Sequence, residues 1–174
     1  MARVFSGGGS RLLVRVNELG TQLAREDLEL VRTLSLAGIV VPHARAESID
    51  AVREIGSPVV AVIESARGVR EAYEIASRAH VLALQLGAND LARDLGLEAR
   101  DDALELLHYR SRLVVDAVAA GVRAIFDRVL ADASVEELEQ DARFGRSLGF
   151  TGKSTTTAAH AGAINRVFGE QTAT

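Results

Sequence analysis

Three charged residues stand where short apolar segments of this sequence end. Arg15 and Glu64 each lie near the close of a segment rich in β-branched residues, and Asp90 follows a third such segment. Carboxylates from separate strands can hold a hard cation, and a guanidinium beside them can bind an anionic group through a fork of donors. An alternative is a structural role, because acids at strand ends often form salt bridges, and Asp90 precedes a helical stretch whose amides it could cap. These residues indicate a joint cation and anion site, provided that the fold brings them to one edge.

The elements that must position these residues follow from the pattern of apolar residues. Short β-branched runs alternate with amphipathic stretches, which indicates repeated strand–helix units and a parallel sheet. The predicted strands cover residues 11–17, 37–43, 57–65, 80–87, 122–129 and 149–155. The predicted helices cover residues 26–34, 47–55, 68–78, 101–120, 134–148 and 157–168. Because the strands are nearly continuous in apolar residues, we expect both faces of the sheet to be covered.

This order gives about six strand–helix units, and the pattern alone leaves two α/β architectures open. A doubly wound open sheet would accept six units, whereas a closed barrel normally takes eight units and about 250 residues. In both architectures ligands bind at the carboxyl ends of the strands. Arg15, Glu64 and Asp90 are therefore expected at the edge where ligands bind.

Composition limits the class of protein. The chain has 174 residues, of which 48% are hydrophobic, and we expect one domain over residues 11–170 after a flexible, Gly-rich lead-in over residues 1–10. Its 24 acidic and 20 basic residues are scattered along the chain, which argues against nucleic-acid binding. No apolar run approaches the roughly 20 residues of a membrane span. These features and the absence of cysteine predict a cytoplasmic protein.

A phosphate-binding loop is a further alternative, because Gly152-Lys153-Ser154 is followed by threonines. Such a loop needs a glycine at position 147, so that its backbone amides can wrap the phosphates. The residue there is Ser147, and a loop starting at Gly149 would be too short to close. We therefore expect Lys153 to belong to a strand, in either a structural or a catalytic role.

Two motifs carry a resemblance to a known family. Residues 63–68, Ile-Glu-Ser-Ala-Arg-Gly, and residues 87–96, beginning Gly-Ala-Asn-Asp-Leu, are similar to motifs of the citrate lyase beta subunit-like proteins within the HpcH/HpaI aldolase superfamily. Their order and the 26 residues from Glu64 to Asp90 also suit that family. The resemblance extends over about residues 11–168.

The resemblance implies a TIM-type (β/α)8 barrel, incomplete in this chain, with Mg2+ held by Glu64 and Asp90 at the carboxyl face of the strands. It implies a carbon–carbon lyase that cleaves a hydroxyacyl-CoA such as citryl-CoA or malyl-CoA, or a related keto acid aldol. It also places Asp127 at a strand end, where its side chain faces either the site or the other side of the sheet.

Substrate binding follows from the same resemblance. Arg15 would bind a substrate carboxylate. The forked donors of its guanidinium suit this task better than the single ammonium group of a lysine. The turn after the fourth strand would add contacts from Gly87, Ala88 and Asn89. Acyl-CoA thioesterase or malate synthase-like activity at the same metal site is one alternative. Another is an inactive barrel fragment that acts as a structural or regulatory partner.

The sequence also departs from the family pattern. Members normally open with two further strand–helix units, to which nothing before Arg11 corresponds. The usual Pro-Lys of one strand is Pro42-His43 here, and the usual Ile-His-Pro after the last strand is Thr156-Thr157-Ala158. A sheet that lacks two strands exposes edges and apolar surface. We therefore expect a homo-oligomer, with a trimer or a hexamer as options, or a partner chain that completes the barrel.

Overall fold

One sheet of seven strands organises the chain in the computed structural model, which describes residues 3–6, 10–100 and 102–169. The order of the strands in the sheet follows the sequence. The strands are β1 (Arg3–Ser6), β2 (Ser10–Arg15), β3 (Gly38–Val41), β4 (Val59–Ile63), β5 (Val81–Leu86), β6 (Ala124–Asp127) and β7 (Gly152–Lys153). β1 pairs antiparallel with β2, and every later pair is parallel.

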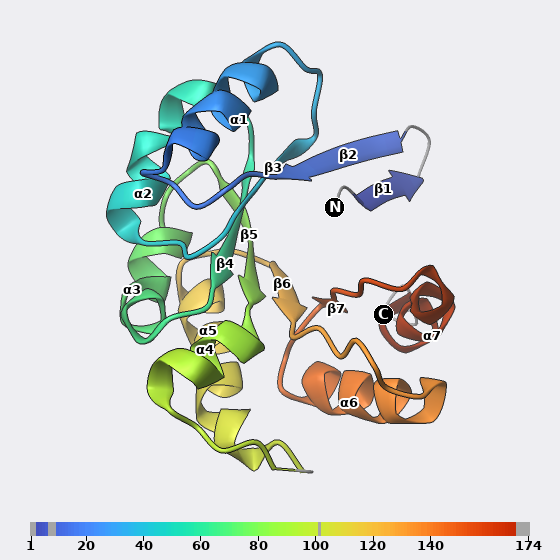
Figure 1. Cartoon of the computed structure of the whole chain (residues 1–174). Helices are drawn as coiled ribbons and strands as arrows, with labels where there is room; N and C mark the ends of the chain where they lie inside the picture. The colour runs from blue at the N-terminus through green and yellow to red at the C-terminus, as the bar shows by residue number, and fades with distance from the viewer. Residues whose placement is uncertain (1–2, 7–9, 101, 170–174) are drawn as a thin grey trace.

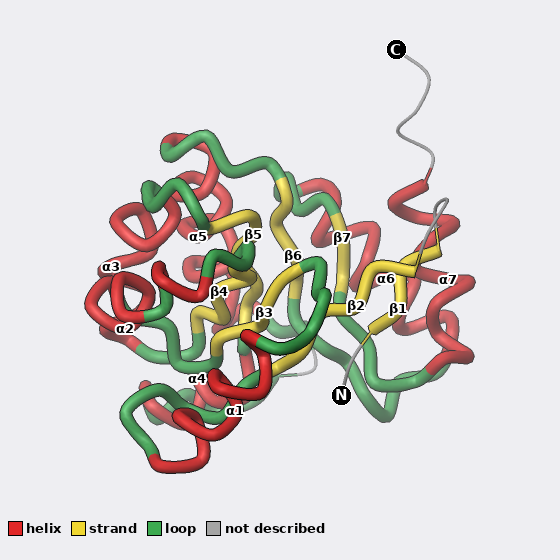
Figure 2. The backbone as a smooth tube through the Cα atoms, turned by 90° about the horizontal axis from the view of Figure 1, so that it is seen from above, coloured by secondary structure: helices red, strands yellow, loops and turns green. Residues whose placement is uncertain are grey.

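Helices connect successive parallel strands and cover the outer face of the sheet (Figure 1). The α-helices are α1 (Gln22–Arg32), α2 (Ala46–Ala51), α3 (Ala66–Ala76), α4 (Ala88–Leu95), α5 (Leu107–Ala119), α6 (Val135–Ser147) and α7 (Ala158–Gly169). Two short 3-10 helices, η1 (Arg53–Ile55) and η2 (Leu104–Leu106), precede β4 and α5. Seen from above, the strands follow a curve with the helices outside it (Figure 2).

Six parallel strands and their outer helices therefore form a curled half-barrel. This arrangement confirms the prediction of an incomplete TIM-type barrel. It excludes the doubly wound alternative, in which helices cover both faces of an open sheet.

The segment expected to be a flexible lead-in contains a strand. Arg3–Ser6 forms β1, and Arg3 lies opposite Leu13 in the antiparallel ladder with β2. The physical reason is that the edge of β2 carries unpaired backbone groups, which an adjacent strand satisfies. Residues 7–9, and the expected domain boundary at residue 170, lie outside the described residues.

The structure contains a helix, α4, that is not among the helix ranges predicted from the sequence. We expected a loop over residues 87–90 before a short helical stretch, and one long helix over residues 101–120, whereas α4 begins at Ala88, separated from the end of β5 by Gly87 alone. It ends at Leu95, and the next residue, Gly96, has a φ of 64°, a left-handed conformation that favours glycine. Asp90 is therefore a residue of the first turn of a helix and not of a loop.

The two faces of the central strand β4 differ in what covers them. Its odd-numbered residues belong to the main hydrophobic core beneath the helices. Val60 and Val62 alternate with these residues, so they point to the concave side of the sheet. Glu64, the residue after β4, continues the same series. The alternation of the strand thus carries Glu64 to the inner rim of the half-barrel.

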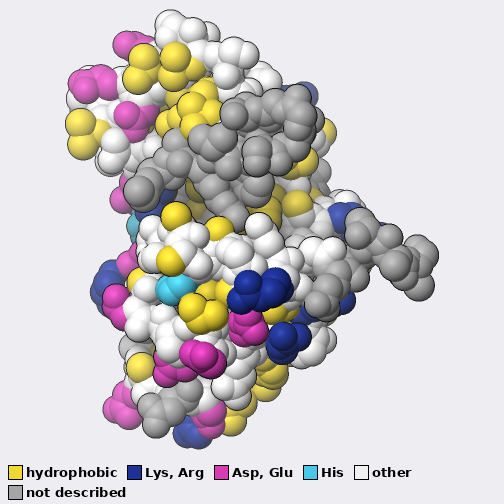
Figure 3. Space-filling model, turned by 90° about the vertical axis from the view of Figure 1, so that its right-hand side faces the viewer, with side chains coloured by type: hydrophobic (Ala, Val, Ile, Leu, Met, Phe, Trp, Pro, Cys, Tyr) yellow, Lys and Arg dark blue, Asp and Glu magenta, His cyan; other side chains and the backbone are white. Residues whose placement is uncertain are grey.

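The side toward which the sheet opens has a mixed surface (Figure 3). Hydrophobic side chains are visible there among Lys, Arg, Asp and Glu, and no single type dominates this face. Among the helices of the described residues, none is both long and apolar enough to cross a membrane.

Candidate functional site

Arg15 ends β2 and points to the concave side of the sheet. Its partner in the parallel ladder is Val40 of β3, and Val40 in turn pairs with Val60 of β4. Residues in register share a face, so Arg15 lies on the same side of the sheet as Val60 and Glu64. Its side chain is exposed and available to a ligand.

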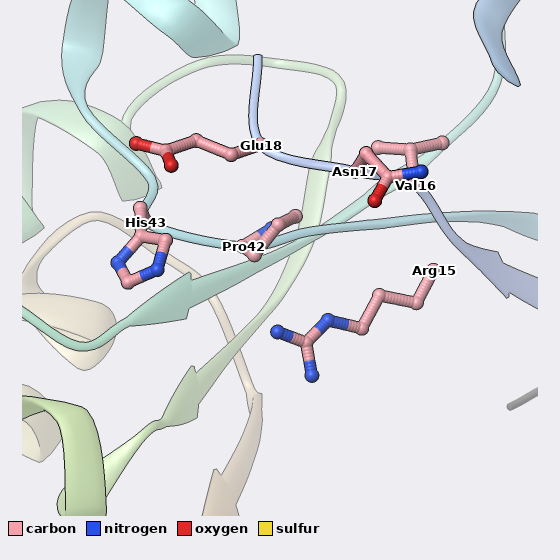
Figure 4. Close-up of a pocket in the computed structure, with 6 residues that line it drawn as sticks. All are labelled: Arg15, Val16, Asn17, Glu18, Pro42 and His43. Atoms are coloured by element: carbon pink, nitrogen blue, oxygen red, sulfur yellow. The ribbon is translucent and has the colours of Figure 1, made fainter. Parts of the chain in front are cut away.

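A pocket of about 270 Å³ opens beside Arg15 at the carboxyl ends of β2 and β3. The guanidinium of Arg15 extends toward the side of the pocket where the ring of His43 lies (Figure 4). The backbone amide and side-chain amide of Asn17 donate to one oxygen of Asp27 in α1, at 2.7 and 2.8 Å, which holds this wall in place. The pocket is lined by Arg15, Val16, Asn17, Glu18, Pro42 and His43.

Glu64 is buried at the rim although it is an acid. Its side chain is 4% exposed, and its Oε1 accepts a hydrogen bond from the backbone amide of His43 at 2.7 Å. Nδ1 of His43 lies 3.6 Å from the same oxygen, which is too long for a direct hydrogen bond. His43 makes this contact from the left-handed backbone region, with a φ of 45°. The end of the neighbouring strand therefore fixes the carboxylate.

Gly87 brings the start of α4 against this carboxylate. A Cβ atom at Gly87 would lie 2.4 Å from Cβ of Glu64 and 2.5 Å from its Oε2, so only glycine leaves the room that Glu64 occupies. The amide of Gly87 donates to the carbonyl of Ile63 at 2.9 Å. Ala88 and Asn89 are the first residues of the helix, and no helical carbonyl reaches their amides. Glu64 thus lies beside a helix N-terminus.

Asp90 lies in the first turn of α4, three residues beyond Gly87. Its side chain is 39% exposed, and Oδ1 forms an ion pair with Arg93, one turn further along the helix. Oδ2 has no partner among the described contacts. In the described part of the chain, no group of three or more His, Cys, Asp or Glu residues could by itself hold a metal ion. A cation at this rim would depend on two protein carboxylates and further oxygen ligands.

The structure arranges the predicted site residues in two groups that His43 connects. Arg15 shares a pocket with His43, while Glu64 contacts both His43 and Gly87. No hydrogen bond or ion pair among the described residues joins Arg15 to Glu64 or Asp90. His43 is not among the site residues predicted from the sequence. Its position at a strand end was the available signal, but a left-handed backbone at a histidine cannot be read from a sequence.

A second cluster of charges, here called the buried charge cluster, lies between β6, β7, α5 and α6. Arg110 of α5 and Asp127 of β6 form a fully buried ion pair. Nζ of Lys153 in β7 lies 2.5 Å from Asp141 of α6 and 3.8 Å from Asp127. Arg128 also donates to Asp141, at 2.8 Å. These five side chains join two strands to the two helices that cover them.

The buried charge cluster answers the open questions about Asp127 and Lys153. Asp127 faces the helices, on the same side as Ile125 of the main core, and not the pocket. Burial pushes the pKa of Asp141 up, but hydrogen bonds from Arg128 and Lys153 hold that pKa well below its usual value. Burial lowers the pKa of Lys153, and the two carboxylates oppose this shift. Lys153 is a strand residue in an ion-pair network, and its contacts are structural.

Comparison with known proteins agrees with the fold. The HpcH/HpaI aldolase/citrate lyase family matches residues 3–158. A (3S)-malyl-CoA thioesterase of Cereibacter sphaeroides is 31% identical over 159 residues, which cover 90% of this chain and 56% of that protein. A citrate lyase subunit beta-like protein of Deinococcus radiodurans is 33% identical over 165 residues, or 91% and 58% of the two chains. The chain spans little more than half the length of these curated relatives.

A solved structure shows the same arrangement of strands and helices. The protein CitE from Mycobacterium tuberculosis, in complex with magnesium and pyruvate, is similar with a TM-score of 0.82 and 28% identity, over 90% of this chain and 67% of that chain. The family match includes Arg15, Glu64 and Asp90. The chain belongs to the HpcH/HpaI aldolase/citrate lyase family.

Proposed function

We propose that this chain provides the site of a Mg2+-dependent carbon–carbon lyase, acting on a hydroxyacyl-CoA such as citryl-CoA or malyl-CoA, or on a related keto acid aldol. The observation that carries the proposal is the environment of Glu64. Its carboxylate is buried, and no lysine or arginine among the described residues pairs with it. A buried carboxylate without a cationic partner costs free energy, which a bound cation would offset.

The donors at the rim fit a hard cation. Glu64 and Asp90 offer only carboxylate oxygens, and Gly87 leaves space where any other side chain would displace Glu64. Two protein carboxylates leave coordination positions for water and substrate oxygens, as Mg2+ usually requires. When bound, Mg2+ would supply Lewis-acid stabilisation of the substrate oxygen that becomes a carbonyl.

The other site residues would bind and orient the substrate. During cleavage the substrate hydroxyl loses its proton and becomes a carbonyl, the carbon–carbon bond breaks, and its electron pair forms a thioester enolate that then takes a proton. Arg15 would hold the substrate carboxylate through paired hydrogen bonds and so orient the bond that breaks. The free amides of Ala88 and Asn89 would donate to the same carboxylate.

Thioester hydrolysis is the second candidate, because a relative of 31% identity is a (3S)-malyl-CoA thioesterase. It would use the same carboxylates and the same arginine, as would a malate synthase-like condensation. The third candidate is an inactive barrel fragment that supports another chain. The lyase, the thioesterase and the malate synthase-like enzyme would all require a cation at Glu64 and Asp90. The inactive fragment would not require one.

The first experiment tests this shared requirement by calorimetric titration of Mg2+, with and without pyruvate or oxaloacetate. We expect the wild-type chain to bind Mg2+ together with the keto acid and Asp90→Ala to lose this binding, because a methyl group cannot replace an anionic ligand. Glu98→Ala is the matched control, since Glu98 is an exposed acid just beyond α4 and should retain binding. Absence of Mg2+ binding by the wild type rejects the enzymatic proposal and favours the inactive fragment.

A second experiment separates the reactions by their products. With malyl-CoA as substrate, a lyase releases a keto acid without a free thiol, whereas a thioesterase releases a free thiol without a keto acid. Condensation followed by hydrolysis consumes added keto acid and acetyl-CoA and releases a thiol. We expect keto acid release that requires Mg2+ and is lost in Asp90→Ala. Release of thiol alone would assign the site to hydrolysis.

A further inference from the structure

His43 has a backbone conformation that is unusual for a residue with a side chain. Its φ is 45°, and Ala103 is the only other non-glycine residue with a positive φ in the described part of the chain. This region is sterically unfavourable for residues with a Cβ atom. Residues held in such conformations cluster at functional sites, so His43 calls for a functional explanation.

The backbone contact with Glu64 does not explain why a histidine occupies this position. The hydrogen bond from the amide of His43 to Glu64 would survive replacement by glycine, which enters the left-handed region without steric cost. What glycine would lack is the ring. That ring is 37% exposed and lines the pocket together with Arg15.

The orientation of the ring sets which nitrogen faces the pocket. Nδ1 lies 3.6 Å from Oε1 of Glu64, so Nε2 is the ring nitrogen that remains for a ligand in the pocket. Figure 4 shows this nitrogen on the side of the ring toward Arg15. An imidazole nitrogen, whether it donates or accepts, can form a hydrogen bond with a hydroxyl group but not with a methylene group.

We propose that His43 is a specificity-determining residue whose Nε2 binds the hydroxyl of a short hydroxy acid, free or as part of a thioester, while Arg15 binds its carboxylate. The inference rests on the proposed function, because it assigns a substrate class to that same site. It predicts discrimination between two acids that differ only in one hydroxyl group.

The test compares malate with succinate, which has the same two carboxylates and no hydroxyl. Calorimetric titration in excess Mg2+ should show that the wild-type chain binds malate roughly five- to tenfold more tightly, the effect of about one hydrogen bond. In His43→Gly this preference should fall by about the same factor, through weaker binding of malate and little change for succinate. The melting temperature of His43→Gly should be equal or higher, because glycine relieves the backbone. His108→Ala, at an exposed histidine of α5, should keep the wild-type preference.

The outcomes separate this inference from the proposed function. Equal wild-type affinity for the two acids overturns the role of His43 and leaves the metal site intact. The same holds if folded His43→Gly keeps the preference, or loses affinity for both acids equally. Binding of neither acid by the wild type, with or without Mg2+, rejects the proposed function together with the inference.

Discussion

At the scale of single residues, the surroundings of Glu64 determine what the strand ends can bind. A carboxylate with 4% exposure has one oxygen bound to a backbone amide and the other against a glycine. Nδ1 of His43 lies 3.6 Å from the first oxygen, and no lysine or arginine among the described residues pairs with Glu64, in contrast to the buried charge cluster, where each acid contacts a lysine or an arginine. This difference supports the proposal that Glu64 takes a cation as its partner.

Gly87→Ala should disturb the site strongly, although it adds only one methyl group. The added Cβ would meet Oε2 of Glu64 at 2.5 Å, so the carboxylate must move or α4 must shift. We expect a loss of about 1–3 kcal/mol in the free energy of unfolding and a loss of Mg2+ binding. Urea denaturation and calorimetry measure the two effects.

Gly162→Ala is the control for the same chemical change. Gly162 lies in α7, and the nearest atom to its added Cβ, apart from the adjacent backbone of the helix, would be a side-chain nitrogen of Arg166 at 3.8 Å. Alanine should stabilise this helix by up to about 1 kcal/mol. Equal effects at both positions would show that Glu64 does not need the space beside Gly87.

At the scale of elements, the buried charge cluster fastens the last two strands to their helices. β6 and β7 are short, with four and two residues, and few ladder hydrogen bonds hold β7 to the sheet. Asp127 of β6 pairs with Arg110 of α5, and Lys153 of β7 pairs with Asp141 of α6. Two further ion pairs, Arg110 with Asp141 and Lys153 with Asp127, connect these two pairs. Side-chain ion pairs therefore contribute to holding the end of the sheet.

Asp141→Asn should weaken this end of the sheet in a way that depends on pH. The pKa of Asp141 is lowered in the folded chain, so its contribution is complete above the usual carboxyl value and is lost as the pH falls. Breaking a largely buried pair should cost about 3 kcal/mol at pH 7. The difference from the wild type should stay constant down to about pH 5 and shrink below about pH 4.

Urea denaturation at several pH values measures this difference. Asp132→Asn, at an exposed acid in the loop before α6, should leave stability unchanged at every pH. A constant difference between Asp141→Asn and the wild type down to pH 3 would contradict the assigned role of the ionised carboxylate.

At the scale of the whole molecule, the described sheet is open, with β1 at one edge and β7 at the other. Hydrophobic side chains are visible on the side toward which the sheet opens (Figure 3). Open edges and exposed apolar side chains favour association. We propose that a second chain, either another copy or a different polypeptide, covers this side.

Light scattering at micromolar concentration tests the version with copies of this chain. We expect a mass above that of the monomer, with a trimer or a hexamer among the options. Dilution should reduce the mass and the melting temperature together, because association stabilises the folded chain. A well-folded monomer at micromolar concentration would contradict the proposal.

The sequence by itself determined the order of strands and helices, the family and the edge at which the charged residues lie. It could do so because the period of apolar residues is a local property, and because the carboxyl ends of parallel strands meet on one side. It missed β1, whose pairing depends on an edge elsewhere in the chain, and α4, which follows β5 without a break.

Only the tertiary structure decided the local geometry of the rim. Packing of separate strand ends sets the left-handed backbone of His43, the contact of Gly87 with Glu64 and the direction of Asp127. The amide of His43 and Oε1 of Glu64 come from residues 21 positions apart, and Asp127 meets Arg110 from another element. Such contacts depend on how far a chain curls and which faces meet, and no local pattern of residues encodes either.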